Sequence, residues 1–115
     1  MARKPRSDRN HIIYQITNTI TGERYIGITV VRGRAFNKSL KIRWEGHLRK
    51  AYIELKNWTF SINIRTYGER VFTKEILEIV RGKATAHKRE VELINTLLPE
   101  LNTKKRLAVQ LELAA

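Results

Sequence analysis

Two tyrosines lie close together near the start of the chain, in segments rich in β-branched and aromatic residues. Tyr14 falls in HIIYQIT (residues 11–17) and Tyr25 in ERYIGIT (residues 23–29), and NTITG between them supplies turn residues. A β-hairpin is therefore predicted. The tyrosines share one face if the strands pair in an odd-sum register, for example with Tyr14 opposite Tyr25, and a slip of one residue would separate them. We expect the shared face, although each tyrosine alone is typical of a structural strand residue.

An arginine and a histidine lie four residues apart in the next periodic segment of the chain. Arg43 and His47 are therefore neighbours on a helix, at the edge of its apolar face. A guanidinium group can bind a phosphate, and an imidazole can share or transfer a proton. The simpler interpretation of this pair alone is the solvated basic edge of a helix that contacts DNA.

One carboxylate falls inside the apolar face of the last predicted helix. Glu90 lies within the arc of that face, where a carboxylate costs free energy unless it is paired or binds a metal ion. Two explanations stay open: a salt bridge to an arginine across the core, or a ligand for a hard divalent cation such as Mg²⁺, which often takes only one or two carboxylates. No histidine pair has zinc-ligand spacing. The apolar face comprises Val91, Ile94, Leu97 and Leu98, with Leu93 at one margin.

Hydrophobic periodicity predicts the elements that position these side chains. After the hairpin, the order β-β-α-α-β-α predicts an α+β fold with a small antiparallel three-stranded sheet flanked by helices. The first helix should bury Leu40, Trp44, Leu48, Ala51, Tyr52 and Leu55. The predicted bounds are a helix over 39–56 with Ser39 as its N-cap, a helix over 59–67 ending at Gly68, a strand over 71–80 and a helix over 84–98 ending at Pro99.

Positive charge is abundant and clustered. The chain has 23 lysines and arginines against 11 acidic residues, a net charge of +12. Residues 30–50 contain seven of the basic residues and one acidic residue, a local net charge of +6. Such clustering predicts a polyanionic partner. Nucleic acid is favoured over an anionic membrane because no basic amphipathic helix has a large apolar face to expose.

Length and composition narrow the class of protein further. A chain of 115 residues predicts one domain, which we place at residues 11–103 between a flexible basic arm (1–10) and a basic, apolar tail (104–115). The absence of cysteine fits a reducing compartment and excludes a cysteine nucleophile. No apolar run approaches the roughly 18 residues of a membrane span, and the N-terminal segment lacks the apolar centre of a signal peptide. We expect no membrane association and a cytoplasmic location.

Five segments follow one another along the chain: IIY (12–14), YIG (25–27), KIRWEGHL (41–48), YGERVFTKEILE (67–78), and HKREVELI followed by LLPELN. In this order they resemble the GIY-YIG nuclease domain, and the phage-type homing endonuclease branch most. The similarity covers about residues 11–102. It departs from the family at Ile12, where the family has glycine, and in a longer stretch between Gly27 and Arg43, which we interpret as an added DNA-contacting loop.

This resemblance implies a metal-dependent DNA endonuclease of a phage or bacterial host that hydrolyses phosphodiester bonds with one Mg²⁺ or Mn²⁺ ion. A phenol with a pKa near ~10 needs nearby cations to act as a base, so the identity of the general base stays open. The implied roles are Tyr14 as general base or water-orienting group, Tyr25 as support for water and phosphate, Arg43 as stabiliser of phosphate charge, His47 as proton carrier or partner of the tyrosine, Glu90 as metal ligand and Asn102 as brace.

Double-stranded DNA is the expected partner. Homing enzymes of this kind usually carry a separate DNA-recognition domain. Three alternatives therefore stay open: the arm, loop and tail bind DNA, a recognition half is missing from this chain, or the protein binds DNA as a homodimer. A restriction or structure-specific repair nuclease and a non-catalytic nucleic-acid-binding module are the alternatives, and only a nuclease needs the carboxylate of Glu90. The basic residues expected to bind DNA are Arg32, Arg34, Lys38, Lys41, Arg49 and Lys50.

Overall fold

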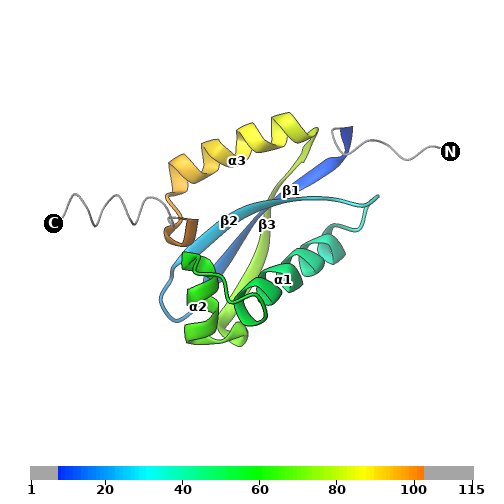
Figure 1. The fold of residues 1–115 in the computed structure, drawn as a ribbon. Helices are drawn as coiled ribbons and strands as arrows, with labels where there is room; N and C mark the ends of the chain where they lie inside the picture. The colour runs from blue at the N-terminus through cyan, green and yellow to red at the C-terminus, as the bar shows by residue number, and fades with distance from the viewer. Residues whose placement is uncertain (1–7, 103–115) are drawn as a thin grey trace.

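A computed structural model describes residues 8–102 of the chain, which form a three-stranded antiparallel sheet with helices on both faces (Figure 1). The strand order β2-β1-β3 and the element order β-β-α-α-β-α confirm the predicted α+β fold. Single turns of 3₁₀ helix follow α2 (Glu69–Val71) and α3 (Glu100–Asn102). The elements are β1 (Asn10–Asn18), β2 (Arg24–Val30), α1 (Phe36–Tyr52), α2 (Thr59–Tyr67), β3 (Phe72–Arg81) and α3 (Lys83–Leu97).

The hairpin of β1 and β2 places both tyrosines on one face of the sheet, as predicted. Tyr14 lies opposite Gly27, and Tyr25 lies opposite Ile16. This is an odd-sum register, displaced by two residues from the example in which the tyrosines oppose each other. The displacement arises because Gly22 has a φ of 81° and belongs to the turn, not to the strand. The tyrosines are therefore diagonal neighbours.

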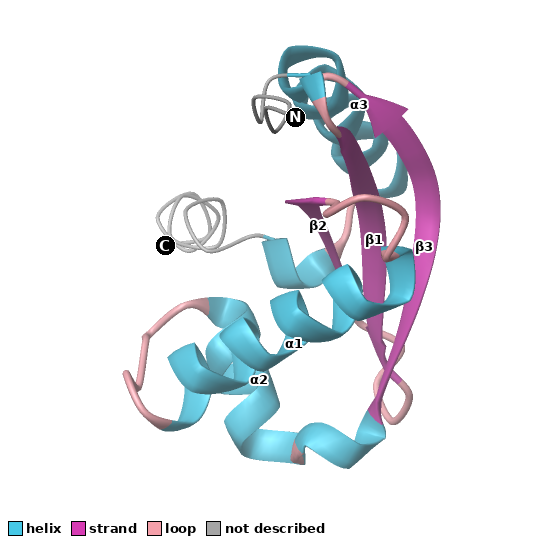
Figure 2. Ribbon diagram, turned by 90° about the vertical axis from the view of Figure 1, so that its right-hand side faces the viewer, coloured by secondary structure: helices cyan, strands magenta, loops and turns pink. Residues whose placement is uncertain are grey.

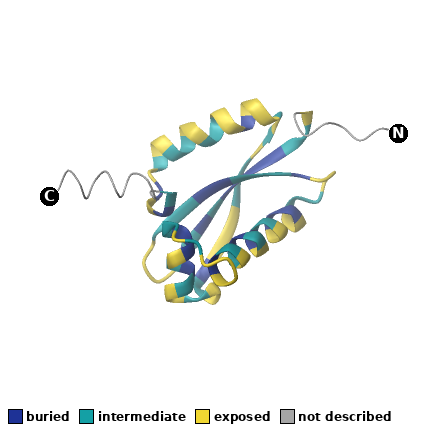
Figure 3. Ribbon diagram, in the orientation of Figure 1, coloured by how far each residue is buried: buried dark blue, intermediate teal, exposed yellow. Residues whose placement is uncertain are grey.

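The tyrosine-bearing face is covered by α1 and α2, which pack side by side on it (Figure 2). Successive strand residues point to opposite faces, so Ile13 and Ile26, both fully buried, face the other layer, which is α3. Buried residues follow the strands, whereas the outer side of α3 is exposed (Figure 3). The main core cluster comprises Ile12, Tyr14, Ile16, Val31, Leu40, Trp44, Ala51, Phe60, Ile64, Phe72 and Leu101.

Helix α1 begins three residues earlier than predicted, and Ser39 is not its N-cap. The cap position is Ala35, whose carbonyl accepts the N–H of Ser39 at 2.9 Å, so Ser39 already lies in the first turn and is buried. The helix also ends earlier than predicted. Leu55 lies beyond the end with a φ of 51°, and the predicted burial of Tyr52 and Leu55 is therefore wrong.

The predicted bounds of α2 and its end at Gly68 are confirmed, with Gly68 at a φ of 86°. The predicted apolar face of α3 is only partly correct. Val91 and Leu98 are 54% and 56% exposed, because α3 lies over the sheet along a narrow stripe in which Ala86 alone is fully buried, and because Leu98 is the left-handed residue that ends the helix. Ile94 remains partly buried.

Residues 8–10 of the predicted arm belong to the described fold, while the rest of the arm and the predicted tail at 104–115 lie outside the described residues. No helix within residues 8–102 is both long enough and apolar enough to cross a membrane.

Candidate active site

The fold brings four of the expected site residues together, from β1, β2 and α1. Tyr14 and His47 are joined by a hydrogen bond of 2.8 Å between Oη and Nε2, and Arg43 Nε donates to the same Oη at 3.3 Å. The Tyr25 ring lies 6.3 Å from the Tyr14 ring and 5.1 Å from the His47 ring, centroid to centroid. These four residues form what we call the tyrosine cluster.

Donor and acceptor chemistry limits the protons in this chain of hydrogen bonds. Arg43 can only donate, so the Tyr14 oxygen accepts from it. We assign to His47 the neutral tautomer with its proton on Nδ1, in which Nε2 accepts the phenolic O–H of Tyr14. This agrees with its pKa, which burial, followed by the positive charges of Arg43 and Lys50, lowers from 6.5 to about 3.

Burial raises the pKa of both tyrosines, because a phenolate would lose its hydration. For Tyr14, which is fully buried, the neighbouring Tyr25 adds to this effect, while Arg43 opposes it. Tyr14 is therefore a neutral hydrogen-bond donor at pH 7. It is a poor base by itself, in contrast to a phenol exposed beside cations.

A glycine makes room for the Tyr14 hydroxyl. A Cβ atom added to Gly27 would lie 2.5 Å from Tyr14 Cζ and 2.9 Å from Tyr25 Cε1, and would touch the Tyr14 hydroxyl. Gly27 does not have a positive φ, so the requirement is one of space. Sequence reasoning matched Gly27 only as a letter of YIG. The register that places it opposite Tyr14 is the signal that explains it.

Sequence reasoning also missed Phe60, which forms the inner wall of the cluster. Its ring stacks on that of Tyr25 at 4.2 Å and 10°, and the His47 ring meets its face at 5.0 Å. Because Phe60 is buried in α2, it fixes the rotation of both rings. The sequence gives no signal for this role, because an apolar ring in a short helix is typical of an ordinary core residue.

Glu90 lies on α3, and its side chain is only 16% exposed. Its partner is His87, one turn earlier on α3, with 3.5 Å between Nδ1 and Oε1, and no arginine within residues 8–102 forms an ion pair with it. Burial raises the pKa of Glu90, while the charges of His87 and Arg43 oppose the rise. The arginine of the tyrosine cluster is thus close enough to act on this carboxylate.

The carboxylate of Glu90 fits a hard divalent cation, because it is poorly hydrated and only weakly neutralised by His87. No group of three His, Asp or Glu side chains gathers within residues 8–102. An ion held by Glu90 would therefore complete its shell with water and substrate oxygens, as Mg²⁺ commonly does.

A cavity of about 330 Å³ lies at the edge of β2, between the helix that carries Arg43 and the helix that carries Glu90. Arg43 belongs to its wall on the α1 side, and His87, the partner of Glu90, belongs to its wall on the α3 side. The cavity is thus basic and open to an anion. Its lining residues are His11, Ile28, Thr29, Val30, Arg43, Lys83 and His87.

Asn102 does not join the tyrosine cluster but holds the strand beneath it. Its side chain accepts the N–H of Ile26 at 2.8 Å and donates to the carbonyl of Ile26 at 2.7 Å. β2 is an edge strand, so these backbone groups have no partner strand on that side. Ile26 lies between Tyr25 and Gly27, and Asn102 therefore fixes the strand at the cluster.

The other basic residues expected to bind DNA lie outside the cluster. Two belong to the loop between β2 and α1, and the remainder lie along α1. Lys50 is half-buried, with Nζ 5.1 Å from the Trp58 ring centroid, and burial together with the charge of Arg43 lowers its pKa. The exposed ones are Arg32, Arg34, Lys38, Lys41 and Arg49.

Comparisons with known proteins give no match: no family model, no curated protein and no solved structure is similar enough to this chain to identify it. The function proposed below therefore rests on the residues and geometry of the site.

Proposed function

We propose that this protein is a metal-dependent DNA endonuclease that hydrolyses phosphodiester bonds at the edge of β2. The observation that carries the proposal is the position of the cavity, which has Arg43 of the tyrosine cluster on one side and His87, the partner of Glu90, on the other. A basic wall suits a phosphate, and a carboxylate that burial has left poorly hydrated suits a cation. Among such enzymes, the sequence resemblance favours the homing type of the GIY-YIG family.

Arg43 would bind the phosphate that is cleaved. Its Nε donates to Tyr14, which fixes the plane of the guanidinium and leaves its other N–H groups for phosphate oxygens in the cavity it lines. Negative charge grows on those oxygens as water attacks phosphorus. A fixed donor aimed at that charge stabilises the transition state more than the substrate.

The Tyr14–His47 hydrogen bond would take up the proton. Tyr14 is fully buried in the free protein, so this step requires that DNA binding admit the attacking water to its hydroxyl. As the water oxygen bonds to phosphorus and the P–O bond to the leaving oxygen breaks, the water proton would pass to the Tyr14 hydroxyl and the Tyr14 proton would move to His47 Nε2. The leaving oxygen is protonated from solvent in the open cavity. A substrate phosphate beside Arg43 offsets the positive charge that lowers the pKa of His47, so the imidazole becomes a stronger base when DNA is bound.

Glu90 would hold one Mg²⁺ or Mn²⁺ ion, with water and substrate oxygens as its further ligands. When bound, such an ion supplies Lewis-acid stabilisation of charge on the phosphate and leaving oxygens.

The direct test is cleavage of supercoiled plasmid, linear duplex and branched DNA by the wild-type chain with Mg²⁺, with Mn²⁺ and with EDTA. We expect metal-dependent cutting that falls by about 10²-fold or more in Arg43→Gln, in line with the loss of one charge-stabilising donor. Arg70→Gln, at an exposed position in the turn before β3, is the matched control and should cut normally.

A non-catalytic nucleic-acid-binding module is the second candidate, and the complete burial of Tyr14 favours it, because a buried phenol with a raised pKa is suited to a structural role. Tight DNA binding by the wild type without cutting of any of the three substrates would establish this alternative. A DNA affinity that falls with increasing salt is expected of both a nuclease and a binding module, because both contact phosphates, so salt dependence does not distinguish them.

A further inference from the structure

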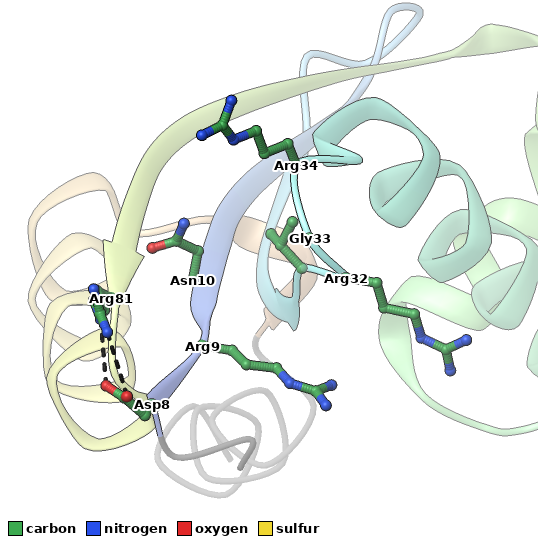
Figure 4. A pocket seen from close by; sticks show the side chains of 8 residues that line it. Asp8, Arg9, Asn10, Arg32, Gly33, Arg34 and Arg81 are labelled. Atoms are coloured by element: carbon green, nitrogen blue, oxygen red, sulfur yellow. Dashed lines mark hydrogen bonds and ion pairs between the residues drawn. The ribbon is translucent and has the colours of Figure 1, made fainter. Parts of the chain in front are cut away.

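A second cavity, which we call the arginine crevice, opens at the end of the sheet beyond the tyrosine cluster. It has a volume of about 420 Å³ and lies where the first residues of β1, the end of β3 and the loop after β2 meet (Figure 4). Its lining residues are Asp8, Arg9, Asn10, Val31, Arg32, Gly33, Arg34 and Arg81.

Backbone hydrogen bonds hold the walls of the crevice together. The N–H of Val31 donates to the carbonyl of Asn10 at 2.8 Å, and the N–H of Gly82 donates to the carbonyl of Arg9 at 2.9 Å. Gly33 turns the loop at a φ of 62°. These two bonds join the start of β1 to the loop after β2 and to the end of β3, so the backbone that forms the crevice is held in place by hydrogen bonds of the fold itself.

The crevice is lined by four arginines and one aspartate, a net charge of +3. Asp8 accepts two hydrogen bonds of 3.3 Å from Arg81 and so fixes that guanidinium at the rim. Arg9 and Arg32 extend to the same side, while Arg34 extends in the opposite direction (Figure 4). The charges are thus spread along the crevice, which matches a chain of phosphates better than a single small anion.

The arginine crevice and the cavity beside Arg43 are lined by residues that are adjacent in the chain. Val30 and His11 line that cavity, and their chain neighbours Val31 and Asn10 line the crevice. The two sites are therefore one residue apart along each of these segments.

We infer that the arginine crevice binds the sugar–phosphate backbone of DNA next to the phosphate that would lie in the cavity beside Arg43. This inference rests on the proposed nuclease function and deepens it. It assigns Arg9 of the predicted basic arm, and Arg81, which sequence reasoning did not place among the DNA contacts, to the same site as Arg32 and Arg34. A strand held at two places would be fixed in register relative to the tyrosine cluster.

The test is a fluorescence anisotropy titration of a labelled DNA duplex over a series of KCl concentrations, in EDTA so that no cleavage occurs. We expect Arg32→Gln and Arg81→Gln each to reduce the slope of log K against log salt by about 0.9, the value for one lost phosphate contact. Arg70→Gln, at the opposite end of β3 from Arg81, should leave the slope unchanged. All three side chains are exposed, so equal melting temperatures are expected.

Four results would overturn the inference. Equal slope changes in all three variants would indicate diffuse attraction by net charge, and unchanged slopes would exclude the contacts. In the wild type, inorganic phosphate could displace the duplex better than chloride at equal ionic strength. If this difference disappeared in Arg81→Gln, the crevice would be a site for a small anion. A wild type that binds but never cuts refutes only the nuclease proposal, because the titration needs no catalysis, while a wild type that does not bind DNA refutes both.

Discussion

The absence of a side chain at Gly27 leaves the space that the Tyr14 side chain occupies. The Tyr14 phenol fills the position that a Gly27 Cβ atom would take, and this contact brings the hydroxyl to His47 and Arg43. The strand–strand register, and no local sequence signal, creates the requirement. Ile12, where the resembling family has glycine, is by contrast a fully buried core residue without such a restriction.

Replacement of Gly27 by alanine should therefore destabilise the fold. We expect Gly27→Ala to lower the free energy of unfolding by about 1–3 kcal/mol, the usual cost of overpacking a core, as measured by urea denaturation. The control is Gly46→Ala within α1, where an added Cβ meets no atom within 4 Å. It should raise stability by up to about 1 kcal/mol through helix propensity. Equal stability of Gly27→Ala and the wild type would refute the close approach.

The buried imidazole of His47 makes stability depend on pH. Its pKa is about 3 in the folded protein and near 6.5 when exposed, so below pH 6.5 the unfolded chain binds a proton that the folded chain does not. Stability from His47 is thus lost as pH falls from 6.5 toward 3, by up to about 1.4 kcal/mol for each pH unit. We therefore expect the free energy of unfolding of His47→Gln, measured by urea denaturation between about pH 7 and pH 4, to depend less on pH than that of the wild type. Parallel profiles for variant and wild type would contradict the assignment.

At the scale of elements, β2 is an edge strand that carries Tyr25 of the tyrosine cluster, and the side chain of Asn102 hydrogen-bonds to the backbone of Ile26 along its free edge. The bounds of α2 and the shared face of the hairpin follow from periodicity and from Gly68, which are local signals. The end of α1 and the exposure of Val91 could not be predicted this way. The first depends on where the chain turns after Tyr52, and the second on how little of the α3 surface contacts the sheet. Both are set by tertiary packing and not by local sequence.

Loss of the Asn102 side chain should loosen β2 locally. In Asn102→Ala, both outward backbone groups of Ile26 lose their partner, and an unpaired buried group costs about 1–3 kcal/mol. Hydrogen exchange at the Ile26 amide should accelerate more than exchange at central β1 amides. Asn95→Ala, exposed on α3, is the control and should leave Ile26 unchanged. Acceleration of all amides alike would indicate a global effect and would argue against a local brace.

At the scale of the whole molecule, the two faces of the sheet carry different chemistry, and they meet at the edge of β2. The tyrosine cluster lies on the face covered by α1 and α2, and Glu90 lies on α3, which covers the other face (Figure 1). Composition and charge clustering predict a polyanionic partner but not this geometry. The sequence left open whether Glu90 pairs with an arginine across the core; in the structure, its partner within residues 8–102 is His87.

The measurement that tests the central claim most directly compares Glu90→Gln with Glu92→Gln in Mg²⁺-dependent DNA cleavage, with DNA affinity measured in parallel in EDTA. Both substitutions remove one carboxylate from α3, but Glu92 is exposed, whereas Glu90 is mostly buried and pairs with His87 of the cavity wall. We predict that Glu90→Gln loses about 10²-fold or more of the cutting rate while it binds DNA at least as well as the wild type, and that Glu92→Gln cuts normally. Equal cutting by both variants would contradict the assignment of Glu90 as the metal-binding residue of a nuclease.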